Sequence, residues 1–462
     1  MSAALAAVIL AAGQGTRMKS SLPKVLHAVA GRPMLAHVIT AAREAGAAPV
    51  VAVIGHGADQ VRSAFSGAGV TFALQAEQLG TGHALQCAAS ELAGFSGALL
   101  LLCGDVPLLR AETLRALLEY HRSQQATVTV LTAELADPRG YGRIIRGLDG
   151  VERIVEEKDA TPLERAVREI NTGIYVFAAP RVFALLGGLT NDNAQGEYYL
   201  TDVIAAARAA GEKVAALAVA RAEEAMGIND RIQLAEAGRA MRARINEGHM
   251  RGGVTLVDPL TTYIEPDVTI GPDTVVHPGV HLRGKTVIGC GCEIDPGVII
   301  SDCTLADRVH VKAGSVLSGS VVGADTDIGP MAHLRPGTVL AGENKIGNFV
   351  ETKKAAIGKG SKASHLTYIG DAEIGAGVNV GCGTITCNYD GVNKHVTVIE
   401  DDVFVGSDVQ FVAPVRIGKG SLIGAGSTIT RDVPAEALAI TRAEQKIIEG
   451  WVARKRAKDN KT

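Results

Sequence analysis

Apolar residues in the first half of the chain alternate between short continuous runs and amphipathic stretches. The runs cover residues 6–10, 50–55, 98–105 and 126–135. The stretches between them carry apolar residues at helical spacing and cover residues 33–47, 82–92 and 111–124. Short apolar runs that alternate with helical stretches predict a mostly parallel sheet with helices on both faces.

The second half of the chain has a different period. An aliphatic residue recurs at every sixth position, with occasional one-residue slips, and glycine often follows it. This pattern predicts a solenoid of short parallel strands with three strands per coil. Two segments, 352–368 and 386–398, break the period and are expected to be loops inserted into the solenoid. The first regular run is Ile264, Ile270, Val276, Leu282, Ile288, Ile294 and Ile300.

A charged stretch with apolar residues at helical spacing separates the two patterns. We therefore divide the chain into three parts. An α/β domain covers residues 1–229, a helical linker covers 230–251, and a solenoid domain with a C-terminal tail covers 252–462.

Composition narrows the classes of protein to consider. The chain has 462 residues, of which 47% are hydrophobic, and its formal net charge of −3 gives no reason to expect a nucleic-acid partner. We expect no membrane partner either, because no apolar run reaches the roughly 18 residues of a membrane span. Seven cysteines without framework spacing predict reduced thiols and a cytoplasmic protein.

The loop after the first apolar run is the first candidate binding site. It contains Gly13, Gly15 and Arg17, and Lys24 follows shortly after. It matches neither the P-loop nor the dinucleotide-binding pattern. Small residues and two cations nevertheless suit a phosphate group, with an ordinary strand-to-helix turn as the alternative.

Further motifs follow this loop in a fixed order. They are LQAEQLGTGHA at 74–84, CGDVPL at 103–108, YGRI at 141–144, VEEKDA at 155–160, EINTGIY at 169–175 and NAQGEYYLTD at 193–202. Their order and spacing resemble the sugar-phosphate nucleotidyltransferases. With the solenoid behind them, nearly the whole chain resembles the family of bifunctional N-acetylglucosamine-1-phosphate uridyltransferase/glucosamine-1-phosphate N-acetyltransferases. The resemblance implies a Rossmann-like mixed sheet followed by a left-handed parallel β-helix.

The resemblance implies a site for UTP and N-acetylglucosamine 1-phosphate in the first domain. Asp105 and Asn229 would be the Mg²⁺ ligands, in keeping with the preference of this cation for oxygen donors. Arg17 and Lys24 would hold the triphosphate, and Gln75 would bind uracil. The other implied positions are Leu10, Ala11, Ala12, Gly13, Gly80, Thr81, Cys103, Gly104, Gly142, Glu156 and Asn171. From the residues alone, Asp105 could equally be a helix N-cap and Glu156 a solvated charge.

The second domain would carry an acetyl-transfer site. An amine that attacks a thioester must lose a proton, and His365 is the expected general base; the alternative is a solvated loop histidine. The resemblance implies that Arg335, Lys353, Tyr368, Asn379 and Lys394 bind the sugar phosphate. It implies that acetyl-CoA is bound by Cys382, Asn388, Tyr389, Ser407, Ala425 and Arg442. Because such sites lie between neighbouring prisms, a homotrimer is also implied.

Two residues depart from the family pattern. Cys103 stands where the family often has tyrosine, and Cys382 stands where it usually has alanine. We expect both positions to contribute through their backbone, so that both sites keep their function.

The expected function is the synthesis of UDP-N-acetylglucosamine, a precursor of peptidoglycan and lipopolysaccharide, by acetyl transfer and then uridylyl transfer. Two alternatives stay open. The β-helix could be only an oligomerising module, against which His365, Lys353 and Arg442 argue. The chain could instead be a non-enzymatic sugar-nucleotide sensor, against which Asp105 and Asn229 argue.

Overall fold

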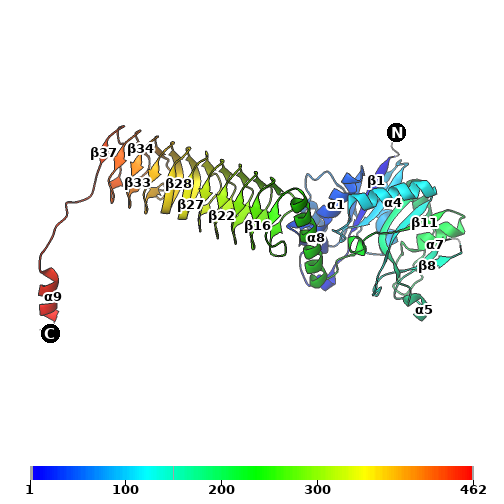
Figure 1. Ribbon diagram of the computed structural model, residues 1–462. Coiled ribbons are helices and arrows are strands. Elements are labelled where there is room, and N and C mark those ends of the chain that lie inside the picture. Colours follow the sequence, from blue (N-terminus) through cyan, green and yellow to red (C-terminus); the bar gives the residue numbers. More distant parts are fainter. Residues whose placement is uncertain (1–3, 149, 460–462) are drawn as a thin grey trace. The chain divides into compact units, whose positions relative to one another are not determined.

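The computed structural model describes residues 4–148 and 150–459 (Figure 1). The chain folds into two compact units, with the boundary between Arg242 and Ala243. Each unit has its own hydrophobic core. None of the described helices is long and apolar enough to cross a membrane.

The first unit is built on a mixed sheet with the strand order β11-β7-β10-β6-β1-β4-β5. β10 runs antiparallel to both of its neighbours, whereas the other strands on this path pair in parallel. The expected Rossmann-like mixed sheet is thereby confirmed. The strands are β1 (Leu5–Ala11), β4 (Val50–Ile54), β5 (Thr71–Leu74), β6 (Ala98–Cys103), β7 (Val128–Glu134), β10 (Glu169–Ala178) and β11 (Val214–Ala218); a hairpin of β8 (Arg143–Gly147) and β9 (Gly150–Val155) joins β10.

Helices cover both faces of this sheet because successive strand residues point to opposite sides. Ile9 and Leu100 pack with residues of α1 (Met34–Glu44) and α4 (Ala111–Gln124) on one face. Val8 and Leu99 pack with α3 (Thr81–Cys87), α6 (Ala179–Leu186) and α7 (Asp202–Ala209) on the other. The helix predicted over 82–92 ends earlier, at Cys87, and a short 3₁₀ turn (Ser90–Leu92) follows it.

A long helix, α8 (Arg231–Arg251), begins at a clear capping signal and runs across the boundary between the units. The Asp230 carboxylate accepts hydrogen bonds from the backbone N–H groups of Ile232 and Gln233, both at 2.9 Å, and so satisfies two otherwise unpaired donors. Within the second unit, the fully buried Asn246 donates from Nδ2 to the carbonyls of Pro259 and Thr262, which ties the last turns of α8 to the segment that follows β12 (Thr255–Leu256).

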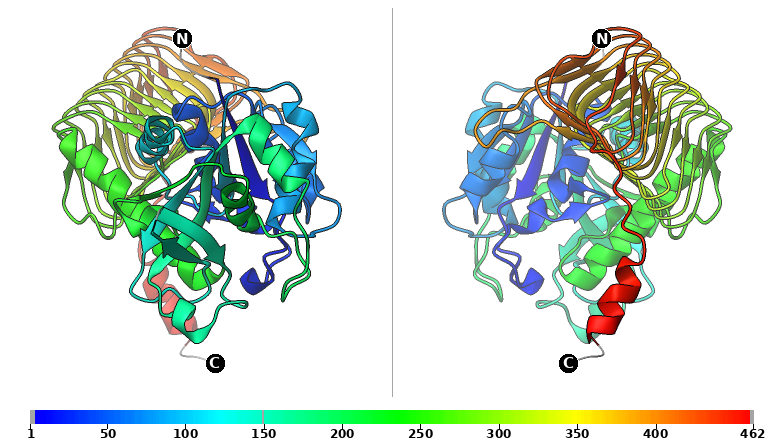
Figure 2. Two further views of the ribbon diagram at one scale, coloured as in Figure 1. Left: turned by 90° about the vertical axis from the view of Figure 1, so that its right-hand side faces the viewer. Right: turned by 90° about the vertical axis from the view of Figure 1, so that its left-hand side faces the viewer.

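The second unit is a parallel β-helix that runs from β12 (Thr255–Leu256) to β37 (Leu438–Ala439). In its regular part each strand pairs in parallel with the third strand after it, so that three strands complete one coil. In Figure 2 these coils are seen nearly end on as stacked turns. The periodic aliphatic residues point inward and are buried, apart from Ile270, which is half-buried.

One sequence expectation is wrong. Segment 352–368 is not an inserted loop, because β27 (Lys345–Ile357) and β28 (Lys362–Ile374) continue the coils and pair along their whole length. Several inward positions here are occupied by the buried residues Thr352, Ala363 and Thr367, whereas Ile357 keeps an aliphatic side chain in the core, so the aliphatic period is weakened while the coil persists. The second interruption does contain a loop, between β30 (Ile385–Cys387) and β31 (Thr397–Ile399).

Candidate active sites

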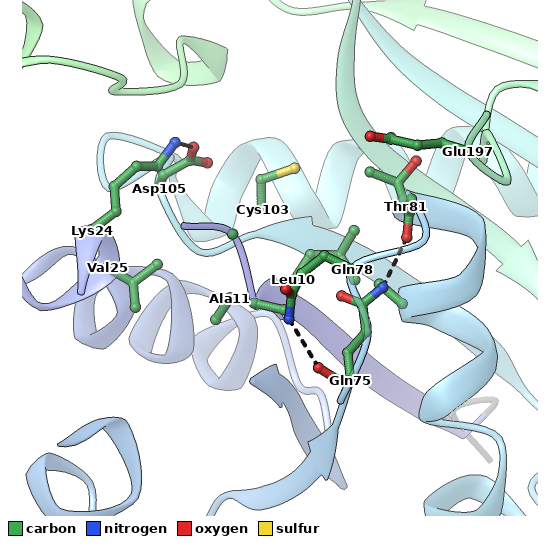
Figure 3. Close-up of a pocket in the computed structure, with 14 residues that line it drawn as sticks. Leu10, Ala11, Lys24, Val25, Gln75, Gln78, Thr81, Cys103, Asp105 and Glu197 are labelled. Carbon is green, nitrogen blue, oxygen red and sulfur yellow. Dashed lines mark hydrogen bonds and ion pairs between the residues drawn. The ribbon is translucent and has the colours of Figure 1, made fainter. Parts of the chain in front are cut away.

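A cavity of about 280 Å³ opens at the carboxyl ends of β1 and β6, beside the point where the strand order reverses (Figure 3). Ligands collect at this position in open α/β sheets. The cavity is lined by Leu10, Ala11, Ala12, Gly13, Lys24, Val25, Gln75, Gln78, Gly80, Thr81, Ala84, Cys103, Asp105 and Glu197. Most of the expected nucleotide-binding residues therefore line one cavity. Val25, Gln78, Ala84 and Glu197 were not foreseen.

Acidic and basic side chains meet at one edge of this cavity. The Lys24 ammonium forms an ion pair with Asp105 and also donates to Asn229 Oδ1 at 3.1 Å. Arg17 donates to the same amide oxygen at 2.9 Å. The backbone holds the two oxygen donors together, because the N–H of Ile228 bonds to the carbonyl of Asp105 at 3.0 Å. A carboxylate and an amide oxygen therefore converge on one cationic group, as the donor set of a Mg²⁺ site requires.

The loop that carries Gln75 is fixed from two sides. Gln75 is buried, and its Nε2 donates to the carbonyl of Gly80 at 3.0 Å, which sets the plane of its amide. Gly80 has a φ of +108°, and a Cβ at this position would lie 2.7 Å from the carbonyl oxygen of Tyr198. Only glycine fits there, so the chain passes close to the 197–200 segment and closes one side of the cavity.

Gly142, Glu156 and Asn171 come together from three separate strand ends. The Gly142 carbonyl accepts a hydrogen bond from Asn171 N at 2.8 Å, and a Cβ on Gly142 would lie 3.4 Å from Glu156 Oε1. Burial raises the pKa of Glu156, against the opposing effect of its hydrogen bond from Thr201. Tyr175 donates to Asn171 Oδ1 at 2.9 Å. Thr201 and Tyr175 belong to motifs that the sequence singled out, but their individual contacts are visible only in the fold.

Cys103 is one of the residues that line the cavity. Its thiol points toward the carbonyl of Gly173 at 3.5 Å. Burial raises the pKa of this thiol to about 12, with a further contribution from the charge of Asp105. Cys103 is therefore neutral at physiological pH and presents only an apolar surface to the cavity.

Several of the residues expected to act in acetyl transfer follow one corner of the β-helix, here called the His365 corner. It is marked by turn residues with positive φ, namely Phe349, Leu366, Gly383, Asp408 and Gly426. Backbone hydrogen bonds link successive coils there, from Gly383 to Leu366, from Asp408 to Cys382 and from Gly426 to Ser407. Cys382, Ser407 and Ala425 are thus stacked on neighbouring coils, and Arg442 donates to the Ala425 carbonyl at 2.8 Å. One continuous edge connects His365 to the expected acetyl-CoA positions.

His365 lies on β28 and not in a loop as the sequence suggested. It stands opposite Asn348 of β27, and its Nδ1 lies 3.0 Å from Asn348 Oδ1. An amide oxygen can only accept, so Nδ1 carries a proton, and in the neutral imidazole Nε2 then has the lone pair. His365 is exposed, which leaves Nε2 free to take a proton from a substrate amine. Asn348 was not foreseen, because nothing in its local sequence sets it apart.

Three cations gather on the neighbouring face. Arg335 donates to Glu351 Oε1 at 2.8 Å. Glu351 is in register with Tyr368, which lies on the next coil. The pKa of Lys353 is lowered, first by hydrogen bonding to Lys394 and then by the Lys394 charge. Two ammonium groups held this close repel one another unless an anion bound between them neutralises their charge. The arrangement suits a dianionic phosphate.

The loop between β30 and β31 supplies Lys394 and two of the expected acetyl-CoA residues. Asn388 donates to the carboxylate of Asp371 at 2.5 Å, and Tyr389 forms a backbone bridge with Lys394. The loop thereby joins the acetyl-CoA positions to the phosphate-binding face. Asn379 lies on β29 (Asn379–Val380) and pairs in register with Lys362 on the preceding coil.

We expect Lys394→Met to raise the KM for glucosamine 1-phosphate by about 10- to 100-fold, since a hydrogen bond to a charged group contributes roughly 1.5–3 kcal/mol. The turnover number should change little, because Lys394 is expected to contact the phosphate and not the reacting amine. Steady-state kinetics of acetyl transfer measure both constants. Lys359→Met removes an exposed lysine of the same unit and should leave them unchanged. An unchanged KM in Lys394→Met would remove this residue from the phosphate site.

These features define two classes of enzyme in one chain, a sugar-nucleotide transferase with a Rossmann-like sheet and an acyltransferase built on hexapeptide repeats. Residues 7–197 match the MobA-like NTP transferase domain family. Residues 263–354 match the GMPPB C-terminal domain, and residues 397–431 match the bacterial transferase hexapeptide family.

Comparison with curated proteins extends this result to almost the whole chain. The bifunctional protein GlmU of Syntrophotalea carbinolica is 67% identical over 97% of this chain and 96% of its own length. The GlmU protein of Pelobacter propionicus is 62% identical over 98% of this chain and 99% of its own. The GlmU protein of Halalkalibacterium halodurans is 55% identical, with 97% and 98% covered. The chain belongs to the family of the bifunctional protein GlmU.

Proposed function

We propose that the chain makes UDP-N-acetylglucosamine in two steps, with one step on each unit. The β-helix transfers an acetyl group from acetyl-CoA to glucosamine 1-phosphate. The α/β unit then joins the product to UTP and releases pyrophosphate. The observation that carries the proposal is the presence of two separate groups of side chains, the His365–Asn348 pair and the cluster of Lys24, Asp105 and Asn229.

In the acetyl-transfer step, the three cations Arg335, Lys353 and Lys394 hold the phosphate of the sugar. Nε2 of His365 takes a proton from the sugar amine as its nitrogen attacks the thioester carbonyl. The carbonyl carbon then gains a bond to nitrogen and loses its bond to sulfur, and the sulfur takes the proton back from His365, so that coenzyme A leaves as its thiol. Asn348 Oδ1 accepts a hydrogen bond from Nδ1–H of His365 and so stabilises the imidazolium that forms.

In the uridylyl-transfer step, a phosphate oxygen of N-acetylglucosamine 1-phosphate attacks the α-phosphorus of UTP, and pyrophosphate leaves. Arg17 and Lys24 neutralise charge on the triphosphate, and Gly142, Glu156 and Asn171 orient the sugar. We propose Asp105 and Asn229 as the ligands of a Mg²⁺ ion, because their oxygens already converge on one cationic group. When bound, the ion supplies charge neutralisation on the phosphates.

We further propose that the chain acts as a homotrimer in the cytoplasm. Support for assembly comes from the His365 corner, where Phe349 and Leu366 are 61% and 60% exposed beside the proposed base. A neighbouring copy that covers these apolar side chains would also complete the acetyl-CoA site. Sedimentation analysis should give three chains per particle. The cytoplasmic location is supported by seven cysteines without a disulfide.

The full-length protein should form UDP-N-acetylglucosamine from glucosamine 1-phosphate, acetyl-CoA, UTP and Mg²⁺. Chromatography of the products, together with release of thiol and pyrophosphate, measures both steps in one tube. Omission of acetyl-CoA should abolish the product, and addition of N-acetylglucosamine 1-phosphate should restore it. Product formation from glucosamine 1-phosphate without acetyl-CoA would contradict the proposed order of steps.

A further inference from the structure

A second group of metal-binding side chains lies on the β-helix, on coils that precede those of the acetyl-transfer site. His277, Glu293 and Asp295 each offer one donor atom, and these atoms lie within 4.8 Å of one another. His310, on the next coil, brings its Nε2 to 3.3 Å from Asp295 Oδ1. One imidazole and two carboxylates thus meet on one face of the helix, and a second imidazole reaches the group through Asp295. Neither proposed reaction uses them.

The coil geometry places these four residues together. Glu293 begins β18 (Glu293–Ile294), and Asp295 directly follows this strand. Because the two residues are two positions apart, they share the outer face, while Ile294 between them is buried. Glu293 is in register with His310 of β21 (His310–Val311). His277 N donates to the carbonyl of Ile294 at 2.9 Å, which sets His277 beside the same strand. Three adjacent coils therefore contribute to one cluster.

Two separations between donor atoms are compatible with neighbouring ligands of one metal ion. His277 Nε2 lies 3.3 Å from Glu293 Oε1, the same distance as in the His310–Asp295 pair. With metal–ligand bonds of about 2.0–2.1 Å, neighbouring ligands of a tetrahedral Zn²⁺ ion stand about 3.4 Å apart. Both contacts are longer than the 2.9–3.0 Å of a typical N–H···O hydrogen bond. The two pairs therefore have the spacing of ligands as well as that of ion pairs.

The state of His310 is the second, independent observation. The His310 side chain is 32% exposed, but its Nε2 is screened from solvent and makes no hydrogen bond among the described residues; its contact there is the 3.3 Å approach to the Asp295 carboxylate. On the other side of the ring, Asp327 Oδ1 lies 3.8 Å from Nδ1. A carboxylate behind a histidine that presents its other nitrogen is the usual support of a metal-bound imidazole.

We propose that His277, Glu293, Asp295 and His310 bind a divalent transition-metal ion of the Zn²⁺ class. Borderline ions favour a mixture of imidazole and carboxylate ligands, whereas Mg²⁺ prefers oxygen donors and retains water. The ion joins three successive coils and satisfies His310 Nε2. Its role is structural, since neither proposed reaction takes place on these coils. The competing interpretation is a row of histidine–carboxylate ion pairs with no ion bound.

Co²⁺ is the probe that distinguishes these interpretations, because its visible absorption reports coordination geometry. The full-length protein, freed of metal with a chelator, is titrated with Co²⁺ in excess Mg²⁺, and bound metal is measured by equilibrium dialysis. We expect one Co²⁺ per chain that Mg²⁺ does not displace, with the intense visible bands of a tetrahedral site. Zn²⁺ should displace it and abolish the bands.

Variants locate the ion. His277→Gln and the isosteric Asp295→Asn should each lose one Co²⁺ equivalent and the visible bands, and Asp327→Asn should weaken binding by about 10- to 100-fold. His333→Gln, which removes an exposed histidine of β25 (His333–Leu334), should keep the wild-type stoichiometry. Equal Co²⁺ binding in the wild type and His277→Gln would overturn the proposal and leave an ion-pair row. Unchanged circular dichroism in Asp295→Asn excludes misfolding as the cause of a loss.

Discussion

Replacement of His365 by alanine is expected to slow acetyl transfer by about 10²- to 10⁴-fold, the usual contribution of a general base. The reason is specific to the arrangement on β27 and β28. Asn348 holds the proton on Nδ1, so Nε2 is the atom that can accept the amine proton. Without it, the amine must lose its proton to water. The rate of thiol release from acetyl-CoA measures the effect at saturating glucosamine 1-phosphate.

Uridylyl transfer by the same preparation is the internal control for His365→Ala, because that reaction is placed on the other unit. His333→Ala is a matched control, since His333 is an exposed histidine of the same β-helix. A loss of less than threefold in His365→Ala would exclude it as the base.

Asn348 provides a further way to test the tautomer argument. Asn348→Ala removes the acceptor that fixes the proton on Nδ1, so the two neutral tautomers of His365 become available. We expect a smaller loss than in His365→Ala, because the base itself is retained. A loss in Asn348→Ala equal to that in His365→Ala would instead show that Asn348 has a role in the reaction beyond the orientation of the imidazole.

The sequence predicted those parts of the fold that depend on repetition. The aliphatic period specified the β-helix because each inward position, such as Ile288 or Ile294, is filled by the same kind of side chain. The α/β unit followed from short apolar runs that became β1, β4, β6 and β7. The antiparallel β10 could not be read from its pattern, since strand direction depends on connections that span distant segments.

The prediction of the 352–368 segment failed where side-chain chemistry changed and backbone geometry did not. Thr352 and Thr367 occupy inward positions that aliphatic residues hold elsewhere, and Thr367 bonds its hydroxyl to the carbonyl of His365 at 2.7 Å. A buried threonine with a backbone partner is stable in such a core. Polarity in the sequence was therefore mistaken for a loop, and the strand residue His365 was placed in it.

Individual site residues were predictable only where a motif carried them. Asp105 ends an apolar run and Lys24 follows a glycine-rich loop, so both stood out along the chain. Asn348 did not stand out, and Thr201 and Tyr175 lay inside motifs without an expected role of their own, because the contacts of all three depend on the pairing of distant segments. Their partners are His365, Glu156 and Asn171, which were all expected. The missing information was three-dimensional pairing and not residue type.

Asp105→Asn is expected to lower uridylyl transfer by at least about 10²- to 10³-fold while acetyl transfer stays near the wild-type rate. Asparagine has the shape of aspartate and retains one oxygen donor, so the change removes charge with little change in volume. Lys24 then loses its ion-pair partner, and Asn229 is left to share its oxygen with Arg17 and Lys24. Pyrophosphate release with N-acetylglucosamine 1-phosphate and UTP gives the rate.

The magnesium dependence of that rate decides how Asp105 acts. If its carboxylate is a metal ligand, the Mg²⁺ concentration for half-maximal rate should rise in Asp105→Asn, and high Mg²⁺ should restore part of the activity. If Asp105 only positions Lys24, the Mg²⁺ requirement should stay constant and Lys24→Met should reproduce the defect. Glu112→Gln, an exposed carboxylate on α4, controls for the loss of one negative charge. Oxygens of Asp105 and Asn229 both contact the Lys24 ammonium. We therefore expect the Mg²⁺ requirement to rise in Asp105→Asn, because the same two oxygens would bind either Lys24 or the metal ion.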